Sequence, residues 1–384
     1  MNSALTAEDL LAQARERTGL DDFGDPIFRS GLDVLCDSLA SAPLSELGRM
    51  VWRGRLHGHL VSRLRVVDWL ARHPATLTLE VPAPIFVIGL PRTGTTALSH
   101  LLAQDPDTRS LRVWESAQPV PPPEIATEHD DPRIAEAEQG LAAMHQFSPQ
   151  LAAMHEDTAT GPTENHDLLG MSFRTLHFEG MAWIPRYVEW WLACDMLPAY
   201  RFMKSALQLL QSRCGPTRWH LKSPPDSLFL DAVLAVFPDA RFVMTHRDPA
   251  SVLGSVCSLI HTFHGLTGAP SDPSMLGRAE HDVWVEAMRR LLVVRARVGE
   301  ARFADVHFHE LNADPVQTIA RAYDHLEVPF TRDAEHRIAA YAAAHPRGRL
   351  GEHRYRLEDW GLDRTGVHAA FAFYTDRCGV KREG

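Results

Sequence analysis

The sequence predicts an α/β fold in which helices flank a doubly wound parallel sheet of the P-loop type. Two observations lead to this prediction. A short run of apolar, β-prone residues at 85–90 precedes a glycine-containing loop and a helical segment, as a buried parallel strand and a phosphate-binding turn require. Farther along, 219–246 has the strand, helix and strand pattern of a βαβ unit.

A helical N-terminal cap is predicted over residues 1–80. Thr6 and Asp9 have the spacing of a capping box, and apolar residues continue at helical intervals from Leu10. Further apolar residues at helical spacing over 31–72 predict two or three more helices, whose pattern we interpret as packing.

The core is predicted to span 84–362 within a single domain of residues 1–384. The apolar run at 85–90 forms its first strand, and 111–113 forms a short second one. The prolines and charges that follow indicate a surface excursion, which continues as a mostly helical insertion of about 120–215.

The rest of the chain alternates between strands and helices. Strands are predicted at 219–221, 240–246 and 306–308. Helices are predicted over 227–237, from 249 to about 263, near 315–326, near 333–344 and over 363–384. Asp226 is available as the N-cap of the first of these helices, and Pro249 suits the first position of the second.

The composition is that of a folded globular chain without a general affinity for nucleic acid. Hydrophobic residues make up 45% and charged residues 23%. The formal net charge of −10 excludes a broadly basic surface, so any anion-binding site must be local. Only three basic residues are lysines, namely Lys204, Lys222 and Lys381.

The cysteines and the hydropathy indicate a reducing compartment. Five cysteines without a Cys-x-x-Cys spacing predict neither a disulfide framework nor a zinc site, and we expect a cytoplasmic location. The N-terminal stretch lacks the pattern of a signal peptide. No apolar run approaches the roughly 18 residues of a membrane span, which leaves only peripheral contact with a membrane open.

The loop at 89–96, Gly-Leu-Pro-Arg-Thr-Gly-Thr-Thr, has the Gly-x-x-x-x-Gly skeleton of a phosphate-binding turn. Backbone N–H groups and a helix N-terminus attract an anion there, although a plain strand-to-helix turn is the alternative. An ATP-hydrolysing loop has lysine where this chain has Thr95, and the cation here is Arg92. The candidate ligands of a phosphate-like group are Arg92, Thr93, Gly94, Thr95 and Thr96.

On these residues the sequence resembles the sulfotransferases that use 3′-phosphoadenosine 5′-phosphosulfate (PAPS). The loop from Pro91 to Thr96 is similar to their 5′-phosphosulfate loop. With arginine at position 92, the loop resembles that of bacterial and tyrosylprotein sulfotransferases. Cytosolic phenol and steroid enzymes typically carry lysine where this chain has Arg92. The resemblance covers 84–362 and implies sulfuryl transfer from PAPS, without a required metal, to a hydroxyl or less readily an amine.

A second signature of that family follows the strand at 240–246. The strand ends in Arg247, and Ser255 comes eight residues later, which implies that both bind the 3′-phosphate of PAPS. Arg347 and Arg354 lie in a C-terminal stretch that resembles the family's loop over the 3′-phosphate, and they are further candidate ligands. An arginine paired to a carboxylate and a serine packed in a helix are the alternatives for Arg247 and Ser255.

Three residues are the catalytic candidates. Arg92 and Lys222 would supply positive charge to the transferring group, and Lys222 resembles the family's sulfate-contacting lysine at a strand end. An ordinary surface lysine at the end of a strand is the alternative for Lys222. Cytosolic members have a catalytic histidine two residues after that lysine, where this chain has Pro224.

The general base is predicted to be Glu115, which occupies the place of the catalytic glutamate of tyrosylprotein sulfotransferases, beyond the loop helix. A salt-bridged or helix-capping role is the alternative for Glu115. The reserve candidates for the base are His220, His246, His155 and Glu164.

The acceptor is predicted to be a small molecule such as an aromatic, lipid-like or polyketide alcohol. Trp183, Tyr187, Trp190 and Trp191 would line an apolar pocket for it, although their helical spacing favours a buried stripe. The competing hypotheses are a nucleotide-dependent small-molecule kinase with a degenerate P-loop and a non-catalytic protein that binds the nucleotide. The sequence gives no indication of the oligomeric state.

Overall fold

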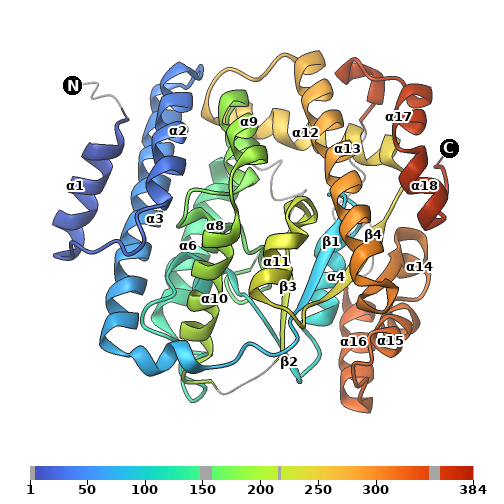
Figure 1. The fold of residues 1–384 in the computed structure, drawn as a ribbon, viewed down its shortest axis with the longest axis horizontal. Helices are drawn as coiled ribbons and strands as arrows, with labels where there is room; N and C mark the ends of the chain where they lie inside the picture. Colours follow the sequence, from blue (N-terminus) through green and yellow to red (C-terminus); the bar gives the residue numbers. More distant parts are fainter. Residues whose placement is uncertain (1–4, 148–157, 215–217, 346–354, 384) are drawn as a thin grey trace.

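Five parallel strands form the central sheet of the computed structural model, which describes residues 5–147, 158–214, 218–345 and 355–383 (Figure 1). The strand order is β2-β3-β1-β4-β5. The strands are β1 Ile85–Gly89, β2 Thr108–Ser110, β3 Arg218–Lys222, β4 Arg241–His246 and β5 Phe303–His307. The predicted doubly wound parallel sheet is confirmed.

Strand β1 lies at the centre of the sheet and is buried at all five positions. Val87 pairs with Lys222 on one side, and Gly89 pairs with Thr245 on the other. The loop after β1 therefore leaves the sheet between the carboxyl ends of β3 and β4, where ligands bind in open parallel sheets.

Alternate residues of the strands face two different helical layers. Ile85 and Val87 belong to a core shared with α4 Thr95–Leu102, α15 Pro315–His325 and α16 Arg332–Ala344. Phe86 and Ile88 belong to a larger core on the other face, which includes α11 Leu230–Val236, α12 Pro249–Thr267 and α13 Pro273–Val298. This alternation is the two-residue period of a strand covered on both faces.

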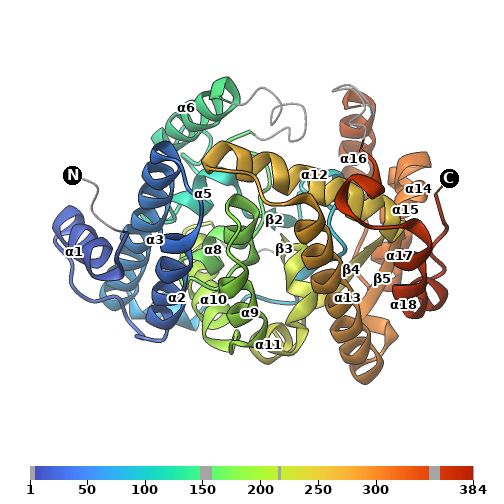
Figure 2. The same ribbon diagram turned by 90° about the horizontal axis from the view of Figure 1, so that it is seen from above.

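The N-terminal helices lie at one side of the molecule, beyond the helices of the insertion (Figures 1 and 2). They are α1 Ala7–Thr18, α2 Phe28–Ser41 and α3 Glu46–Arg72, followed by a 3₁₀ turn at Pro74–Thr78. The Thr6 hydroxyl accepts a hydrogen bond from the Asp9 backbone N–H, as the capping pattern predicts. Helix α5 Val113–Ala117 precedes the insertion. The insertion contributes α6 Pro132–Phe147, α8 His166–Gly170, a 3₁₀ turn at Leu176–Met181, α9 Pro185–Ala193 and α10 Leu197–Gln211.

Two predicted strands are displaced along the sequence. Strand β2 ends at Ser110, before the predicted 111–113, because Arg112 and Glu115 form a capping box that starts α5 at Val113. Strand β5 ends at His307, and Phe308 already begins α14 Phe308–Ala313.

Two helical predictions also differ from the structure, and one long helix has no predicted counterpart. The predicted helix over 227–237 is a 3₁₀ turn at Pro224–Leu228 followed by α11, and Asp226 lies inside the turn rather than at the N-cap. The predicted C-terminal helix is two short helices, α17 Arg364–Ala370 and α18 Ala372–Cys378. The long helix α13 was not predicted, although Asp272 caps it.

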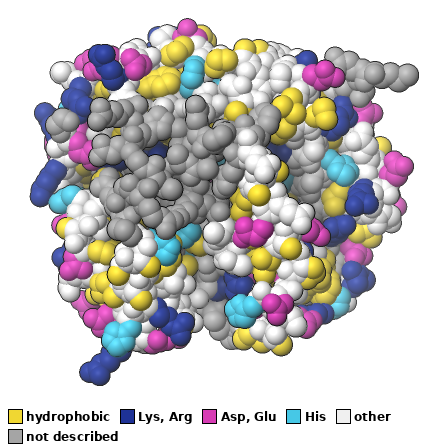
Figure 3. Space-filling view, turned by 180° about the vertical axis from the view of Figure 1, so that it is seen from behind, with side chains coloured by type: hydrophobic (Ala, Val, Ile, Leu, Met, Phe, Trp, Pro, Cys, Tyr) yellow, Lys and Arg dark blue, Asp and Glu magenta, His cyan; other side chains and the backbone are white. Residues whose placement is uncertain are grey.

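The surface carries both charge signs. On the face seen from behind, acidic, basic and histidine side chains are interspersed over the coloured atoms (Figure 3). The net charge of −10 is therefore not gathered into one acidic area of that coloured surface. Among the described helices, none is both long and apolar enough to cross a lipid bilayer.

Candidate active site

The loop between β1 and α4 is held in a conformation that needs glycine at two positions. Gly89 and Gly94 have positive φ angles of 119° and 90°. A Cβ atom on Gly89 would lie 2.5 Å from the Thr245 carbonyl oxygen, so the loop passes close against β4. Arg92 also has a positive φ, 60°, which is rare outside glycine and concentrates at functional sites.

The loop presents hydrogen-bond donors to an anion. No described residue accepts a hydrogen bond from the backbone N–H of Thr93, Gly94 or Thr95, and these groups stand at the N-terminus of α4. The Thr93 hydroxyl is taken up beneath the loop, because it donates to the Leu90 carbonyl oxygen at 2.7 Å. Thr93 is thus left with its backbone N–H as donor, and the cradle fits a phosphate-like group.

The two sequence signatures meet beside this loop. The Arg92 Nε donates a hydrogen bond to the Ser255 Oγ at 3.1 Å, although 163 residues separate them. The Arg247 Nη1 donates to the Arg92 carbonyl oxygen at 3.2 Å. Ser255 lies on α12, which begins directly after Arg247 and Asp248. Two guanidinium groups and a hydroxyl therefore line one place at the carboxyl ends of β1 and β4.

Arg247 is enclosed by residues that sequence analysis did not single out. Its guanidinium carbon lies 4.2 Å from the centre of the Phe308 ring, and it forms an ion pair with Glu383. Tyr355 also lies beside Arg247, and a Cβ atom on Gly254 would lie 2.7 Å from the Tyr355 ring. Tyr355 belongs to the stretch in which Arg354 was predicted, so the motif contained this signal. Arg347 and Arg354 lie outside the described residues.

Lys222 ends β3 on the other side of β1. Its ammonium nitrogen donates to the Glu164 Oε1 at 2.7 Å. The Lys222 side chain is 6% exposed and that of Glu164 is 29% exposed. Burial alone would raise the pKa of Glu164, but the charges of Lys222 and His166 hold it well below the usual glutamate range. Glu164 is therefore an ionised, partly accessible carboxylate next to the predicted sulfate-contacting lysine.

A buried hydrogen-bond chain fixes the segment that carries Glu164. The Asn165 backbone N–H donates to the Lys222 carbonyl oxygen at 3.2 Å, and its side-chain amide donates to Asp226 at 2.8 Å. The other carboxylate oxygen of Asp226 accepts from the Tyr200 hydroxyl at 2.7 Å. Burial raises the pKa of Asp226 to about 7. Asp226 thus ties the insertion to the end of β3 instead of capping a helix.

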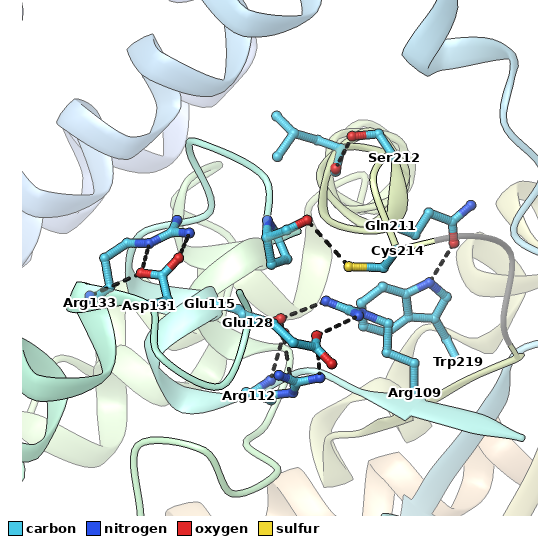
Figure 4. A network of polar contacts seen from close by, with 12 residues as sticks. Arg109, Arg112, Glu115, Glu128, Asp131, Arg133, Gln211, Ser212, Cys214 and Trp219 are labelled. Atoms are coloured by element: carbon cyan, nitrogen blue, oxygen red, sulfur yellow. Dashed lines mark hydrogen bonds and ion pairs between the residues drawn. The ribbon is translucent and has the colours of Figure 1, made fainter. Parts of the chain in front are cut away.

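Glu115, the predicted base, is fully buried in an ionic network (Figure 4). One carboxylate oxygen accepts from the Arg109 Nη2 at 2.6 Å, and the other accepts from the Arg112 backbone N–H at 3.3 Å. Glu128 completes the network on the same two arginines. Burial raises the pKa of Glu115 although both arginines oppose the shift. This geometry matches the alternative of a salt-bridged, helix-capping glutamate, and no part of the carboxylate is open to an acceptor.

The reserve histidines that the structure describes are also buried. His220 is in contact with the Ser99 hydroxyl at 3.1 Å, and burial lowers its pKa to about 3. His246 lies between Asp305 and Tyr374, at 2.7 and 3.0 Å. His155 lies outside the described residues. Among the reserve candidates that the structure describes, Glu164 is the one that contacts Lys222.

The aromatic cluster of the insertion is part of the core. Tyr187 and Trp191 are buried, and the Tyr187 hydroxyl donates to the Phe173 carbonyl oxygen at 3.0 Å. Trp183 and Trp190 are partly buried against the same core. The helical stripe is thus a packing feature, as its spacing favoured.

The sequence and the fold of this chain are similar to those of known sulfotransferases. Residues 84–332 match the profile of the Sulfotransferase family. Omega-hydroxy-beta-dihydromenaquinone-9 sulfotransferase Stf3 of Mycobacterium tuberculosis is 26% identical over 308 residues, 75% of this chain and 76% of that protein. The solved structure of sulfotransferase STF9 from Mycobacterium avium has a TM-score of 0.90 and 33% identity, covering 100% of this chain and 99% of that one. Sulfotransferase STF1 from Mycobacterium tuberculosis H37Rv has a TM-score of 0.87 and 31% identity, covering 97% and 100%.

Proposed function

Because the chain belongs to the sulfotransferase family and is a sulfotransferase, we propose that its donor is PAPS and its acceptor a hydroxyl of a small, lipid-like molecule. The observation that carries the donor proposal is the meeting of Arg92, Ser255 and Arg247 beside a loop whose N–H groups have no described acceptor. An arginine in the loop and a second arginine next to it suit a donor with two separate anionic groups.

The loop and the second signature divide the donor between them. The backbone N–H groups of Thr93, Gly94 and Thr95, with the Arg92 side chain, would bind the 5′-phosphosulfate. The Thr95 and Thr96 hydroxyls stand at the first positions of α4. Arg247 and Ser255 would bind the 3′-phosphate, as the resemblance implies.

The positions of Lys222 and Glu164 support the following transfer step. The donor supplies an activated sulfuryl group. As the acceptor oxygen forms its bond to sulfur, the bond from sulfur to the bridging phosphate oxygen breaks, and that oxygen keeps the electron pair. Glu164 takes the acceptor's proton, since its carboxylate is ionised and partly exposed. Lys222 and Arg92 stabilise the charge on the sulfuryl and leaving oxygens.

Glu164 is the base that we propose in place of Glu115. Its low pKa ensures that the carboxylate is ionised, and its contact with Lys222 links the proton acceptor to the charge that develops on the sulfuryl group. When Lys222 turns toward those oxygens, the Glu164 carboxylate loses its cation and becomes a stronger base.

The acceptor proposal rests on the curated relative. The name of Stf3 describes a hydroxylated menaquinone derivative as its substrate, and we propose a lipid-like alcohol of this kind for the present chain. We also propose a cytoplasmic location, which is supported by the fact that all five cysteines are free thiols.

The experiment that tests the proposal is incubation of the protein with PAPS and a panel of lipid, phenol and sugar alcohols, followed by mass spectrometry for SO₃ addition. We expect addition to a lipid-like alcohol. In parallel, 3′,5′-adenosine bisphosphate should raise the melting temperature and Mg-ATP should not. Stabilisation by Mg-ATP alone would refute PAPS as the donor.

A further inference from the structure

The arginine proposed to bind the 3′-phosphate already holds a carboxylate. The Arg247 Nε donates to the Glu383 Oε1 at 2.8 Å, and the Nη2 donates to the Oε2 at 2.9 Å. The third nitrogen, Nη1, donates to the Arg92 carbonyl oxygen. Each guanidinium nitrogen thus has an oxygen acceptor within the chain, and the edge that forks toward Glu383 is the edge that recognises an oxyanion.

The backbone of Glu383 is fixed as well as its side chain. Its N–H donates to the Asp248 Oδ2 at 2.8 Å, and its carbonyl oxygen accepts from the Arg364 Nη1 at 2.9 Å. Asp248 is a buried residue that caps α12, so it is a rigid anchor. The segment after α18 therefore delivers Glu383 to Arg247 in one defined conformation.

Resting on the proposed function, we propose that Glu383 is an internal competitor of the donor's 3′-phosphate. In the free protein its carboxylate occupies the place on Arg247 that the 3′-phosphate takes, and donor binding releases the segment 379–383. Carboxylate and phosphate oxygens are recognised by the same planar fork of arginine, so the two cannot share it. The apparent donor affinity is then lowered in proportion to the fraction of molecules in which Glu383 is bound.

A competing role and a positioning role of Glu383 predict opposite changes in donor affinity when Glu383 is removed. If Glu383 only oriented Arg247 for the phosphate, its removal would weaken donor binding. If Glu383 competes, its removal strengthens binding of ligands that carry a 3′-phosphate and leaves other ligands unaffected. The Glu383 side chain is 36% exposed, so the expected effect is modest, about three- to tenfold.

The test is calorimetric titration of the full chain with 3′,5′-adenosine bisphosphate and with adenosine 5′-monophosphate, which lacks the 3′-phosphate. The variants are Glu383→Gln and Arg364→Ala, which removes the hydrogen bond to the Glu383 carbonyl oxygen and so weakens the anchoring of the segment without touching Arg247. Glu16→Gln is the matched control, since Glu16 is exposed on α1. Melting temperatures verify that each variant is folded, and hydrogen exchange of residues 380–383 follows release of the segment.

We expect both variants to bind the bisphosphate about three- to tenfold more tightly and the monophosphate unchanged, with Glu16→Gln like the wild type. In the wild type, the bisphosphate should accelerate exchange of the 380–383 amides. Unchanged or weaker bisphosphate binding by Glu383→Gln overturns the inference. If neither wild type nor variant binds the bisphosphate, the donor proposal is itself wrong and the inference falls with it.

Discussion

Replacing Glu164 by glutamine distinguishes the contribution of the proposed base from that of Lys222 beside it. The amide oxygen of glutamine still accepts from Lys222, which donates to the carboxylate at 2.7 Å in the native chain. The substitution therefore removes the proton acceptor and one negative charge but leaves the cation in place. We expect kcat to fall about 10²- to 10⁴-fold, roughly 3 to 5 kcal/mol of barrier, with bisphosphate affinity unchanged.

The stability of this variant should change much less than its activity. At 2.7 Å the native pair has a Coulomb attraction on the order of 6 kcal/mol at an effective dielectric constant of about 20. Glu164 is partly exposed, so solvent screens this attraction, and glutamine keeps the hydrogen bond to Lys222; the net loss should therefore be about 1 to 2 kcal/mol. A melting curve and a single-turnover assay of sulfated product by mass spectrometry measure the two quantities separately.

Glu115→Gln is the matched control, because it makes the same change in a fully buried carboxylate. We expect kcat within about threefold of wild type and a loss of about 2 to 4 kcal/mol in stability, since Arg109 loses the nearer of its two ionised partners among the described residues and keeps only Glu128 at 3.7 Å. Full activity in Glu164→Gln, or a folded Glu115→Gln variant with the large kcat loss, would refute the assignment and return the role to Glu115.

Two further predictions concern stability and the loop. Burial raises the pKa of Glu280 to about 7 and that of its neighbour Glu179 above its usual range, so the folded state holds protons that the unfolded state releases. Stability should therefore fall by about 2 kcal/mol as pH rises from 5 to 8, and Glu280→Gln should flatten this dependence in urea titrations at each pH. Gly89→Ala should cost about 2 to 4 kcal/mol and abolish bisphosphate binding, because its Cβ would meet the Thr245 carbonyl oxygen at 2.5 Å. Gly54→Ala on α3, where a Cβ meets no atom within 4 Å, should instead leave binding intact in the same titration and stabilise the chain by up to about 1 kcal/mol.

The arrangement of the loop and Arg247 was predictable because its signals are contiguous in the sequence. The loop from Gly89 to Thr96 lies between a strand and a helix, and Arg247 directly follows β4, which neighbours β1 in the sheet. Local order in the chain therefore carried most of the geometry. The exact ends of β2 and β5 were missed, since capping of the following helices decides where those short strands stop.

The partners of the site cations were not predictable in this way. Glu164 is 58 residues from Lys222, and Glu383 is 136 residues from Arg247, so only tertiary packing brings them together. Glu115 differs from these two carboxylates, because its partners lie close to it in the sequence. Its position beyond the loop helix suggested a base, but Arg109 and Arg112, both within six residues, enclose it. The sequence did contain a signal for this ion pair, namely two arginines close to Glu115.

The hydrogen bond from the Asn165 N–H to the Lys222 carbonyl oxygen anchors the insertion to the sheet, and this anchoring bears on how related enzymes could come to use different acceptors. The residues that we propose to bind the donor belong to the sheet and its adjoining loops, whereas the proposed proton acceptor, Glu164, lies on the insertion. Substitutions in the insertion can alter acceptor preference without rebuilding the nucleotide site, provided that the short anchored segment around Glu164 is kept. Relatives with different acceptors would then differ mainly in the insertion and share the sheet and its adjoining loops.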